Sequence, residues 1–485
     1  MHRIDDDVVV VGAGPAGLHA AVEAARAGAS VTLLDEQHAP GGQIYRSLPA
    51  GFSVGDPAAL GPDYADRTRL LAEFGRWRVR TLYGALAWGW ATERTVEVVH
   101  DGQCLRVSGT SVVLATGAYD RPTPLPGWTL PGVLTVGGAQ TLLKTQRVVP
   151  GRRLLLAGTG PLLLVVAAQL AAAGAEIVAV IDPVPARSVL PHLPALLRAW
   201  PVTRRGLGYH WVLRRRRVPW ITPAVILRIE GDGRVQRAVY ARSDAGWRPI
   251  PGTEREVEVD TVCLGYGLVP SIELARAAGA AVAYDADQDV WVPVRNDSFE
   301  TTVKGVFAVG DGAGVAGAVV AAEEGRIAGI AAAQRAGRIP QAEAGLRCRG
   351  PRARLDGLRA FRRAMDHVYR VRGGLQAAVT PDTVVCRCEE VSAHEIASAV
   401  ADGAGSLNQV KAWTRAGMGP CQARMCGLTV ARMVASLAAR PVADVGCATP
   451  RPPVKPVPIE VLAQDRGTAD TPALPANDRR TDHRV

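Results

Sequence analysis

The glycine-rich stretch GAGPAG, at residues 12–17, decides how this chain folds. The β-branched run Val8–Val11 before it is typical of a buried strand, and Leu18–Ala27 after it has the pattern of a helix. A second strand is expected at Ser30–Leu34, and Asp35 ends it, 23 residues after the first glycine. Strand, glycine turn, helix, strand and acid in this order indicate a Rossmann-like unit that binds a dinucleotide.

Each glycine of this stretch has a separate physical role. The first permits the tight turn, the second lets the backbone approach a pyrophosphate, and the third lets the helix pack closely on the strand. The helix N-terminus offers amide groups and the positive end of the helix dipole to the phosphates. The acid is expected to bind ribose hydroxyls and to repel a 2′-phosphate. The residues assigned to this site are Gly12, Gly14, Pro15, Ala16, Gly17, Asp35 and Glu36.

Two later segments and one loop identify the dinucleotide. Residues 112–117 have a strand pattern that ends in Thr116-Gly117, and residues 302–311 have another that ends in Gly310-Asp311. The helical pattern of Ala316–Ala333 follows, and its small residues are expected to face the ligand. Together with the loop Gly41-Gly42-Gln43, these features resemble the FAD domain of the two-dinucleotide-binding flavoproteins.

This resemblance implies that FAD is the first cofactor. It implies that Asp311 bonds the ribityl chain of the flavin and that the helix after it points its positive end at the flavin. A helix cap is the alternative role of this acid, and one residue can serve both. The residues that the resemblance assigns to the flavin side of the site are Gly42, Gln43, Thr116, Gly117, Gly310 and Asp311.

A second unit repeats the first. A strand at Arg153–Ala157 precedes GTGPLL at residues 158–163, an apolar helix runs to Ala173, and a strand at Glu176–Ile181 ends in an acid. The uncharged stretch 154–175 is long enough to cross a membrane, but burial within an α/β sandwich explains it better. The residues assigned to this second nucleotide site are Gly158, Gly160, Pro161 and Asp182.

The ligand of the second unit stays open. Leu163 replaces the third glycine, which weakens the case for a nucleotide, and Asp182 disfavours NADP. NAD, ATP or ADP, and a vestigial unit without ligand are the alternatives. No CxxC pair lies near either glycine turn, which argues against a disulfide reductase. Cys104 and Cys263 lie in apolar strand patterns and are interpreted as buried small hydrophobic residues.

Four of the eight cysteines lie close together near the end of the chain. Their pattern is C-x-C, then 32 residues, then C-x4-C. Four thiolates can hold an iron–sulfur cluster. Zinc is the main alternative, although structural zinc usually uses C-x2–4-C pairs, and unmetallated cysteines are the third. Lys411, Arg415 and Arg424 lie close in sequence to offset negative charge. The residues assigned as metal ligands are Cys386, Cys388, Cys421 and Cys426.

The spacing of these cysteines resembles the bacterioferritin-associated ferredoxin-like (BFD-like) domain, which implies a [2Fe-2S] cluster. The predicted fold class is therefore α/β, with two nested Rossmann-like domains and a small helical [2Fe-2S] domain. The predicted domains are the two parts of the FAD domain at 1–145 and 286–338, the inserted nucleotide domain at 146–285, an Arg-rich helical connector at 339–380, the cluster domain at 381–440 and a Pro-rich tail at 441–485.

The whole chain resembles one family more closely. The stretches 118–122, 126–133 and 414–427 carry a resemblance to the larger (α-type) subunits of opine oxidases, hydrogen cyanide synthase and dye-linked proline or hydroxyproline dehydrogenases. This implies an electron-transferring subunit of a heteromeric amine or imino-acid dehydrogenase or oxidase. The implied partners are a β subunit, which is a flavoprotein of the amino-acid-oxidase type, and a further small subunit, with FMN shared at the contact. No residue has a motif-based case for acid–base catalysis, so none is assigned.

Two other functions remain alternatives: a self-contained NADH-dependent reductase that feeds the cluster, and an assembly or sensor protein with structural cofactors. The net charge of +10 reflects 52 arginines against four lysines, and no nucleic-acid recognition module is found. The run Arg214–Arg217 is interpreted as a solvated surface, with contact to an acidic partner as its functional alternative. The acidic N-terminus lacks a secretory signal pattern, so the expected location is cytoplasmic.

Overall fold

The structure is a computed structural model that describes residues 2–48, 51–52 and 62–463. Its first sheet has the strand order β3-β2-β1-β6-β5-β4, with β19 beside β6, and it confirms the predicted α/β class. Strands β1, β2, β3, β6 and β19 run parallel, and β4 and β5 form an antiparallel edge. The strands span β1 His2–Val11, β2 Val31–Asp35, β3 Arg80–Tyr83, β4 Leu86–Trp90, β5 Thr95–His100, β6 Gln103–Leu114 and β19 Val306–Ala308.

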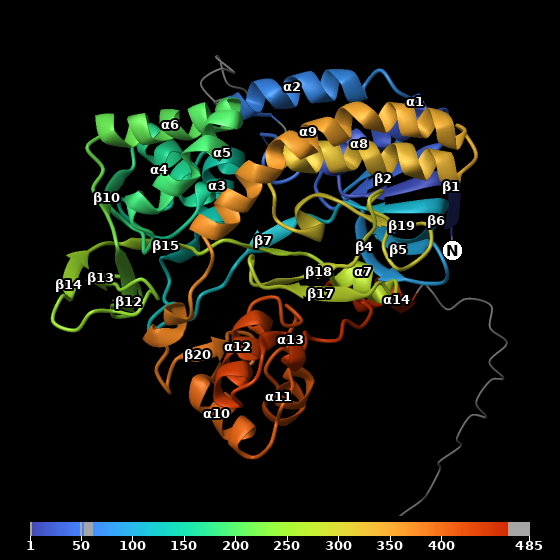
Figure 1. Ribbon diagram of the computed structural model, residues 1–485. Coiled ribbons are helices and arrows are strands. Elements are labelled where there is room, and N and C mark those ends of the chain that lie inside the picture. The colour runs from blue at the N-terminus through green and yellow to red at the C-terminus, as the bar shows by residue number, and fades with distance from the viewer. Residues whose placement is uncertain (1, 49–50, 53–61, 464–485) are drawn as a thin grey trace, which may run out of the picture.

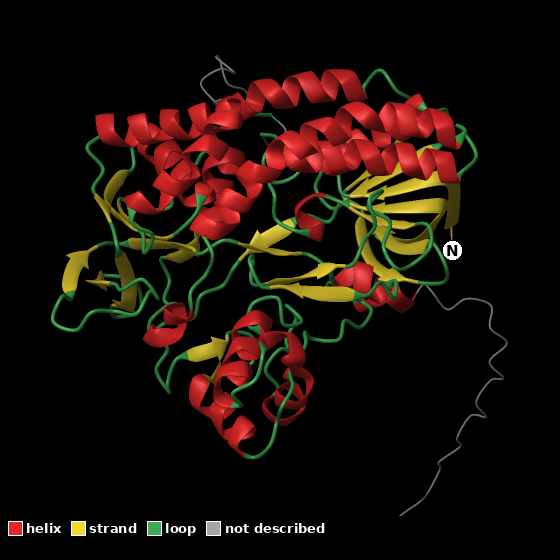
Figure 2. Ribbon diagram, viewed as in Figure 1, coloured by secondary structure: helices red, strands yellow, loops and turns green. Residues whose placement is uncertain are grey.

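Four long helices cover one face of this sheet and form the upper layer in Figures 1 and 2. Small residues let two of them approach closely: a side-chain carbon at Gly325 would lie 2.0 Å from the Ala16 carbonyl oxygen, and one at Gly329 would lie 2.3 Å from that of Ala20. The prediction that small residues of the late helix face the ligand is therefore wrong for these two glycines, because they face a neighbouring helix. The four helices are α1 Pro15–Arg26, α2 Pro62–Phe74, α8 Ala318–Arg335 and α9 Gln341–Val368.

A second parallel sheet, with strand order β11-β10-β9-β15-β8, carries the inserted nucleotide fold. It uses residues from 133 to 265, so it begins and ends earlier in the chain than the expected 146–285. The strands span β8 Val133–Thr135, β9 Arg153–Gly158, β10 Glu176–Ile181, β11 Trp220–Ile221 and β15 Thr261–Gly265. Its helices are α3 Val136–Thr141, α4 Pro161–Ala172, α5 Leu193–Arg198 and α6 Trp200–Arg215. A separate antiparallel sheet contains β12 Ala224–Glu230, β13 Arg237–Arg242 and β14 Arg255–Glu258.

A short ribbon joins the two nucleotide folds and crosses the middle of Figure 1. It pairs β7 (Ala118–Asp120) with β16 (Leu268–Pro270) in antiparallel register. Helix α7 (Glu273–Ala277) follows, and a hairpin of β17 (Val282–Asp285) and β18 (Val290–Pro293) leads back to the first sheet. The ribbon therefore lies between the two nucleotide folds, and the two parts of the predicted FAD domain meet where β19 pairs with β6.

The last folded unit is helical and lies below the ribbon in Figure 1. A reciprocal capping box between Ser392 and Glu395 starts its first helix, because each side chain satisfies a free backbone amide of the other. This unit contains β20 Val384–Cys386, β21 Val391–Ser392, α10 Ala393–Ala401, α11 Leu407–Thr414, α12 Gly427–Leu437 and α13 Val442–Val445. A final segment then returns to the first sheet and ends in α14 (Ile459–Ala463). The end of the predicted tail, residues 464–485, lies outside the described residues.

Three expected elements differ in length from the observed ones. The expected strand at 302–311 is only three residues long, β19, and a 3₁₀ helix follows at Gly310–Ala313. The first strand is longer than Val8–Val11 because its N-terminal half pairs with β6. The uncharged stretch 154–175 forms β9 and the 12-residue α4. Across the described ranges, no helix has the length and hydropathy that crossing a membrane requires.

Candidate functional site

The glycine turn of the first site is packed without room for side chains. Gly12 has φ +106°, and a side-chain carbon there would lie 2.3 Å from the Ala115 carbonyl oxygen. One at Gly17 would lie 1.7 Å from the carbonyl oxygen of Gly12. The turn therefore holds the start of α1 against the ends of β1 and β6. Amides in the first turn of a helix have no acceptor within the helix, so they are available to a phosphate.

Asp35 fastens this turn from the end of β2. It is only 8% exposed, and its two carboxylate oxygens accept hydrogen bonds from the amides of Ala13 at 2.5 Å and Gln37 at 2.7 Å. Burial raises the pKa of its carboxyl. The neighbouring acid, Glu36, is more exposed and forms an ion pair with Lys455 of the C-terminal segment. The expected contact of the two acids with ribose stays a prediction.

The loop at residues 41–43 lies against the same turn. The Gly41 amide donates to the Ala13 carbonyl at 2.8 Å. Gly42 has φ +59°, and a side-chain carbon there would lie 2.7 Å from Cα of Gly14. Gln43 is exposed and accepts a hydrogen bond from Arg46. The structure thus brings this loop and the glycine turn together, and the contact of the loop with a flavin stays a prediction.

The other two expected flavin segments also meet. A side-chain carbon at Gly312 would lie 2.7 Å from Oγ1 of Thr116 and 3.0 Å from the Gly117 amide. One oxygen of Asp311 accepts hydrogen bonds from the amides of Ala316 and Gly317, both at 2.9 Å. Asp311 therefore holds the turn before α8, but the N-cap residue of that helix is Gly317, which receives no side-chain cap bond. Its bond to a ribityl chain stays a prediction.

These residues fit FAD sterically. Three segments that are far apart in the sequence converge at the carboxyl ends of β1 and β6, where α/β sheets bind ligands. Glycines line the closest approaches, so the backbone can contact a ligand without hindrance from side chains. The first and second parts of the predicted FAD domain thus contribute to one cradle.

The first glycine of the second site is packed as tightly as those of the first site. Gly158 lies against Gly265, whose carbonyl oxygen would be 1.9 Å from a side-chain carbon at Gly158. Gly160 and Pro161 start α4, as predicted. Leu163 is only 1% exposed and belongs to the core between α4 and the second sheet.

The acid of the second site is turned inward. Asp182 is 6% exposed and accepts a hydrogen bond from the Val184 amide at 2.9 Å. Burial raises the pKa of its carboxyl to about 6. An acid in this position serves the loop after β10 in the way that Asp35 serves the first turn. Its geometry provides no direct argument for a bound ribose.

The four assigned cysteines lie in two loops of the helical unit, and they face each other in pairs. Cys386 pairs with Cys426, and Cys388 pairs with Cys421. The thiol of Cys426 and the Gly417 amide, 3.4 Å from Sγ, lower the pKa of Cys386 to about 5. Considering only the described residues, no three His, Cys, Asp or Glu side chains converge on one point that could hold a metal ion. The charges of Cys388 and Cys421 also act on Cys426, so the two pairs lie close to one another.

The cysteine loops have an unusual backbone. Four non-glycine residues in them have positive φ angles, and Gly417 has φ +87°. Left-handed conformations cost about 1–2 kcal/mol each for residues with a side chain, so neighbouring interactions must stabilise these loops. The four are Glu390, Arg415, Gln422 and Ala423.

The basic residues expected to offset cluster charge have other partners. Arg415 pairs with Glu389 at 2.8 Å, and Arg424 pairs with Glu273 of α7 at 3.4 Å. Lys411 instead lines a cavity beside the cysteine loops. The Arg415 pair thus joins the two cysteine loops to each other, and the Arg424 pair connects them to α7.

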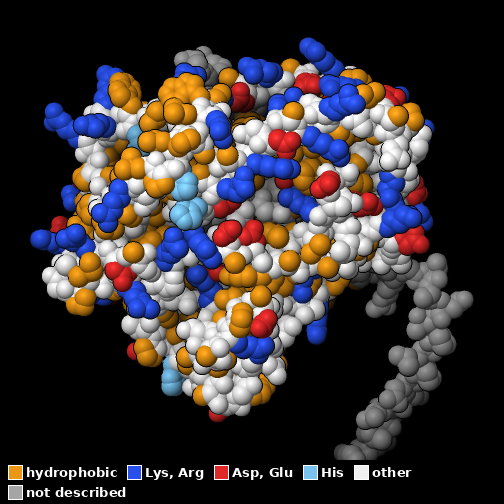
Figure 3. Space-filling view, viewed as in Figure 1, with side chains coloured by type: hydrophobic (Ala, Val, Ile, Leu, Met, Phe, Trp, Pro, Cys, Tyr) orange, Lys and Arg blue, Asp and Glu red, His pale blue; other side chains and the backbone are white. Residues whose placement is uncertain are grey.

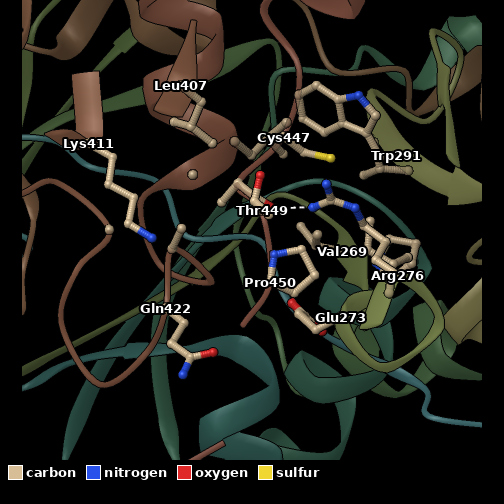
Figure 4. Close-up of a pocket in the computed structure, with 18 of the residues that line it drawn as sticks. Val269, Glu273, Arg276, Trp291, Leu407, Lys411, Gln422, Cys447, Thr449 and Pro450 are labelled. Carbon is tan, nitrogen blue, oxygen red and sulfur yellow. Dashed lines mark hydrogen bonds between the residues drawn. The ribbon is translucent and has the colours of Figure 1, made fainter. Parts of the chain in front are cut away.

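This cavity has a volume of about 250 Å³ and lies where the cysteine loop, the ribbon, α7 and the C-terminal segment meet. In Figure 4, Lys411 and Gln422 lie on one side and Arg276 on the other, with its guanidinium hydrogen-bonded to the Ala448 carbonyl. Tyr119 of the ribbon also lines the cavity. Burial raises the pKa of its hydroxyl, and the charge of Cys421 also raises this pKa. The ribbon thus connects the cysteine loops to Thr116-Gly117.

A buried ionic network, which no sequence pattern indicates, fastens the helical unit to the ribbon. Asp289 accepts from Arg121 at 2.6 Å and lies 3.2 Å from Nε of Arg432 on α12. Tyr284 donates a further hydrogen bond to the same carboxylate. Arg121 lies in a stretch that carries the family resemblance, but no local pattern identifies its partner 168 residues away.

Comparison with known proteins agrees with this architecture. Residues 6–337 match the family described as pyridine nucleotide-disulphide oxidoreductase, and residues 381–466 match the sarcosine oxidase A3 domain. The chain is 37% identical over 476 residues to the opine oxidase A-subunit of Agrobacterium tumefaciens (strain Ach5), covering 96% of this chain and 92% of that protein.

Two further similarities extend over nearly the whole chain. Hydrogen cyanide synthase subunit HcnB of Pseudomonas aeruginosa is 34% identical over 480 residues, with 95% of this chain and 98% of that protein covered. The crystal structure of L-proline dehydrogenase from P. horikoshii superimposes with a TM-score of 0.65 at 20% identity, covering 95% of this chain and 80% of that one. At this identity the structural match shows a shared fold.

Proposed function

The chain belongs to the pyridine nucleotide-disulphide oxidoreductase family and is an FAD-dependent oxidoreductase homologous to the opine oxidase A-subunit, and from this premise we propose that it is the electron-transferring subunit of a heteromeric amine or imino-acid dehydrogenase or oxidase. Its partner in this proposal is an amino-acid-oxidase-type flavoprotein subunit that oxidises a C–N bond. A further small subunit, with an FMN at the contact between subunits, belongs to the same proposal.

The observation that carries the proposal is the position of the cysteine loops beside the ribbon. Tyr119 lines one cavity together with Gln422 and Ala423 of the cysteine loops. It follows Thr116-Gly117 of the FAD cradle by two residues. The described FAD cradle and the four thiols are therefore connected through one short strand. A path between an FAD and a metal cluster would have this arrangement.

In the proposal, the glycine turn and the start of α1 hold the pyrophosphate of FAD, and the loops at 41–43, 116–117 and 310–311 surround the flavin. When bound, FAD supplies the chemistry that accepts an electron pair and releases single electrons. The chain contributes the binding geometry, the amides that face the phosphates and the exclusion of side chains from the turn.

For the four cysteines we propose a [2Fe-2S] cluster. The four thiols lie near one another, as the ligands of one cluster must, and structural zinc usually uses C-x2–4-C pairs rather than the C-x-C pair present here. The cluster also gives a reason for the strained loops, because metal binding can stabilise a backbone conformation that is costly by itself.

The second nucleotide site is proposed to hold ATP or ADP, or to be structural, rather than to bind NADH for catalysis. Leu163 fills the core where the third glycine would lie, and Asp182 is directed into its own loop. The rival function, a self-contained NADH-dependent reductase, requires a working nicotinamide site in this place.

The decisive experiment is anaerobic reduction of the purified complex with its partner subunit. A panel of imino acids and opine-type amines should bleach the flavin absorbance and give the electron paramagnetic resonance signal of a reduced [2Fe-2S] cluster, whereas NADH should do neither. Rapid bleaching by NADH alone would favour the rival reductase.

The metal site is tested with Cys421→Ser against a matched control, Cys447→Ser, which lines the cavity but is not an assigned ligand. We expect the first variant to lose iron, acid-labile sulfide and electron transfer to a dye, and the second to retain all three. Full electron transfer in the Cys421 variant would refute the cluster.

A further inference from the structure

A long basic segment of the inserted domain has no role in the proposed electron path. Between Asp182 and Glu230, residues 183–229 contain nine arginines and no acid. This segment includes the run Arg214–Arg217, for which the sequence leaves open both a solvated surface and contact with an acidic partner. The structure places 22 of these 47 residues in α5 and α6, on the surface of the molecule.

Helix α6 exposes large apolar side chains together with arginines along one stripe. Trp200, Leu207 and Trp211 are 47%, 54% and 60% exposed. At 100° per residue, Arg204 and Arg215 project within about 60° of the same direction. The Arg215 guanidinium lies over the Trp211 ring, 5.2 Å from its centre. We name this stripe the basic apolar face.

The basic apolar face is not needed to fold the helix. Leu213, on the opposite side of α6, is buried, and it packs with Leu163 and Val166 of α4 in the core of the inserted domain. A helix that already has a buried apolar side and then exposes tryptophan on its other side has a second surface to cover.

Exposed leucines continue this surface along the chain before α6. Three of them lie in the 3₁₀ helix at Ala186–His192 and in α5, and they are as exposed as the residues of α6. They are Leu190 at 60%, Leu193 at 47% and Leu197 at 64%. Figure 3 shows orange and blue side chains side by side over the upper left of the molecule, where Figure 1 places α6.

We propose that the basic apolar face docks this protein onto the surface of a membrane that contains anionic lipids. Helices that lie in a bilayer interface combine tryptophan and leucine on one side with arginines that reach the headgroups. The part of this segment that forms α5 and α6 contains arginines and no acid, so it is complementary to a surface of uniform negative charge.

A protein partner fits these observations less well. Tryptophan and arginine are enriched at protein interfaces as well, but a protein would have to present a patch without basic groups to this acid-free helix, whereas an anionic bilayer is negative over its whole surface. Arg205, which projects away from the stripe, pairs with Asp66 of α2 at 2.7 Å. The arginines of the stripe itself would contact headgroups while Trp200, Leu207 and Trp211 enter the acyl boundary. Binding would then be peripheral and reversible.

The test is flotation of the full chain with vesicles of phosphatidylcholine alone and with vesicles that also contain phosphatidylglycerol. We expect binding to the second kind only, and weaker binding as salt increases. The double variant Leu207→Glu with Trp211→Glu should bind about tenfold less or weaker, because it places two charges at the apolar centre of the face. The matched control is Leu346→Glu, since Leu346 is 57% exposed on α9, away from this face.

Circular dichroism and dye reduction should be unchanged in the double variant and the control, since neither changes the FAD cradle or the cysteine loops. The proposal is overturned if the native chain ignores anionic vesicles or if the double variant binds them like the native chain. It is also overturned if the double variant loses the partner subunit instead of the vesicles, because the face is then a protein interface.

Discussion

At the scale of single residues, Gly42 gives the sharpest test of the FAD cradle. A methyl group there would lie 2.7 Å from Cα of Gly14, and its φ of +59° disfavours any side chain. We expect Gly42→Ala to displace the loop from the glycine turn and to lower FAD retention about tenfold or more, as measured by the ratio of flavin to protein absorbance.

The matched control for this variant is Gly28→Ala. Gly28 also has a positive φ, +85°, but no atom lies within 4 Å of the added carbon. It should therefore carry the conformational cost of about 1–2 kcal/mol without displacing the cradle. Equal loss of FAD in both variants would mean that backbone strain, and not the contact with Gly14, explains the effect.

Asp182 leads to a prediction about pH. Burial raises the pKa of its carboxyl to about 6, well above the usual value for an aspartate. The folded chain therefore binds a proton between about pH 4 and 6 that the unfolded chain does not, so this group favours folding at low pH and that contribution is lost as pH rises through 6.

We expect Asp182→Asn to flatten the dependence of Tm on pH in this window and to raise the Tm relative to the native chain most clearly at pH 7. The gain is on the order of 1–2 kcal/mol, because the amide needs no charge desolvation and its Oδ1 can still accept from the Val184 amide, while its NH2 group replaces the second carboxylate oxygen. An unchanged pH profile would show that the carboxyl is not the group that titrates.

At the scale of elements, the C-terminal segment acts as a strap across the FAD domain. The Val454 amide donates to the Trp88 carbonyl at 2.7 Å, and the Cys104 thiol donates to the Val461 carbonyl at 3.2 Å. Its Lys455 pairs with Glu36. The strap thus covers the antiparallel edge β4-β5-β6 and reaches the acid beside the predicted ribose site.

Truncation after residue 450 removes these contacts, and truncation after residue 463 removes none of them. We expect the shorter chain to melt several degrees lower and to lose FAD faster on dilution, since Trp88 and Cys104 lose apolar cover. The longer truncation should match the full chain in both assays. Equal behaviour of the two truncations would show that the strap does not stabilise the domain.

The elements that sequence predicts well are those with a local cause. Both glycine turns, β10 and α10 are predictable within a residue or two, because hydrophobic periodicity and turn chemistry specify them. The features that could not be predicted depend on contacts with residues that are far away in the sequence. Gly325 and Gly329 face α1 rather than a ligand, and the short β19 ends early because a 3₁₀ turn brings Asp311 to the start of α8.

The sites show the same division. The four cysteines and both acids are identifiable from their spacing, but the bonds of Asp35 to backbone amides are not, since a carboxylate at the end of β2 has the same sequence in either role. Lys455 offers one usable signal, because it is one of only four lysines in the chain. Its partner lies 419 residues away, so no local pattern identifies the pair.

At the scale of the whole molecule, the buried network around Asp289 determines how the cysteine domain sits on the rest of the chain. Its carboxylate is 6% exposed and lies between Arg121 of the ribbon end and Arg432 of α12, whose side chains are 4% and 13% exposed. Trp128 adds a hydrogen bond to the Val384 carbonyl at 2.6 Å, at the start of strand β20, which ends at Cys386. Loss of the central charge would leave two guanidinium groups buried without a counterion.

We therefore expect Asp289→Asn to cost about 3–5 kcal/mol in the free energy of unfolding, the usual range when one partner of a buried ion pair is removed. Because this contact joins domains, the first visible effect should be faster proteolysis of the connector at 370–383 while the FAD domain stays folded. The matched control is Asp287→Asn, because the Asp287 side chain is 73% exposed and its pair with Arg370, at 3.4 Å, is worth at most about 1 kcal/mol.

If the cysteine domain receives electrons through the ribbon, the Asp289 variant should also slow dye reduction while leaving flavin bleaching by substrate unchanged. A variant that slows both would locate the defect in the FAD domain and not in the docking of the two domains.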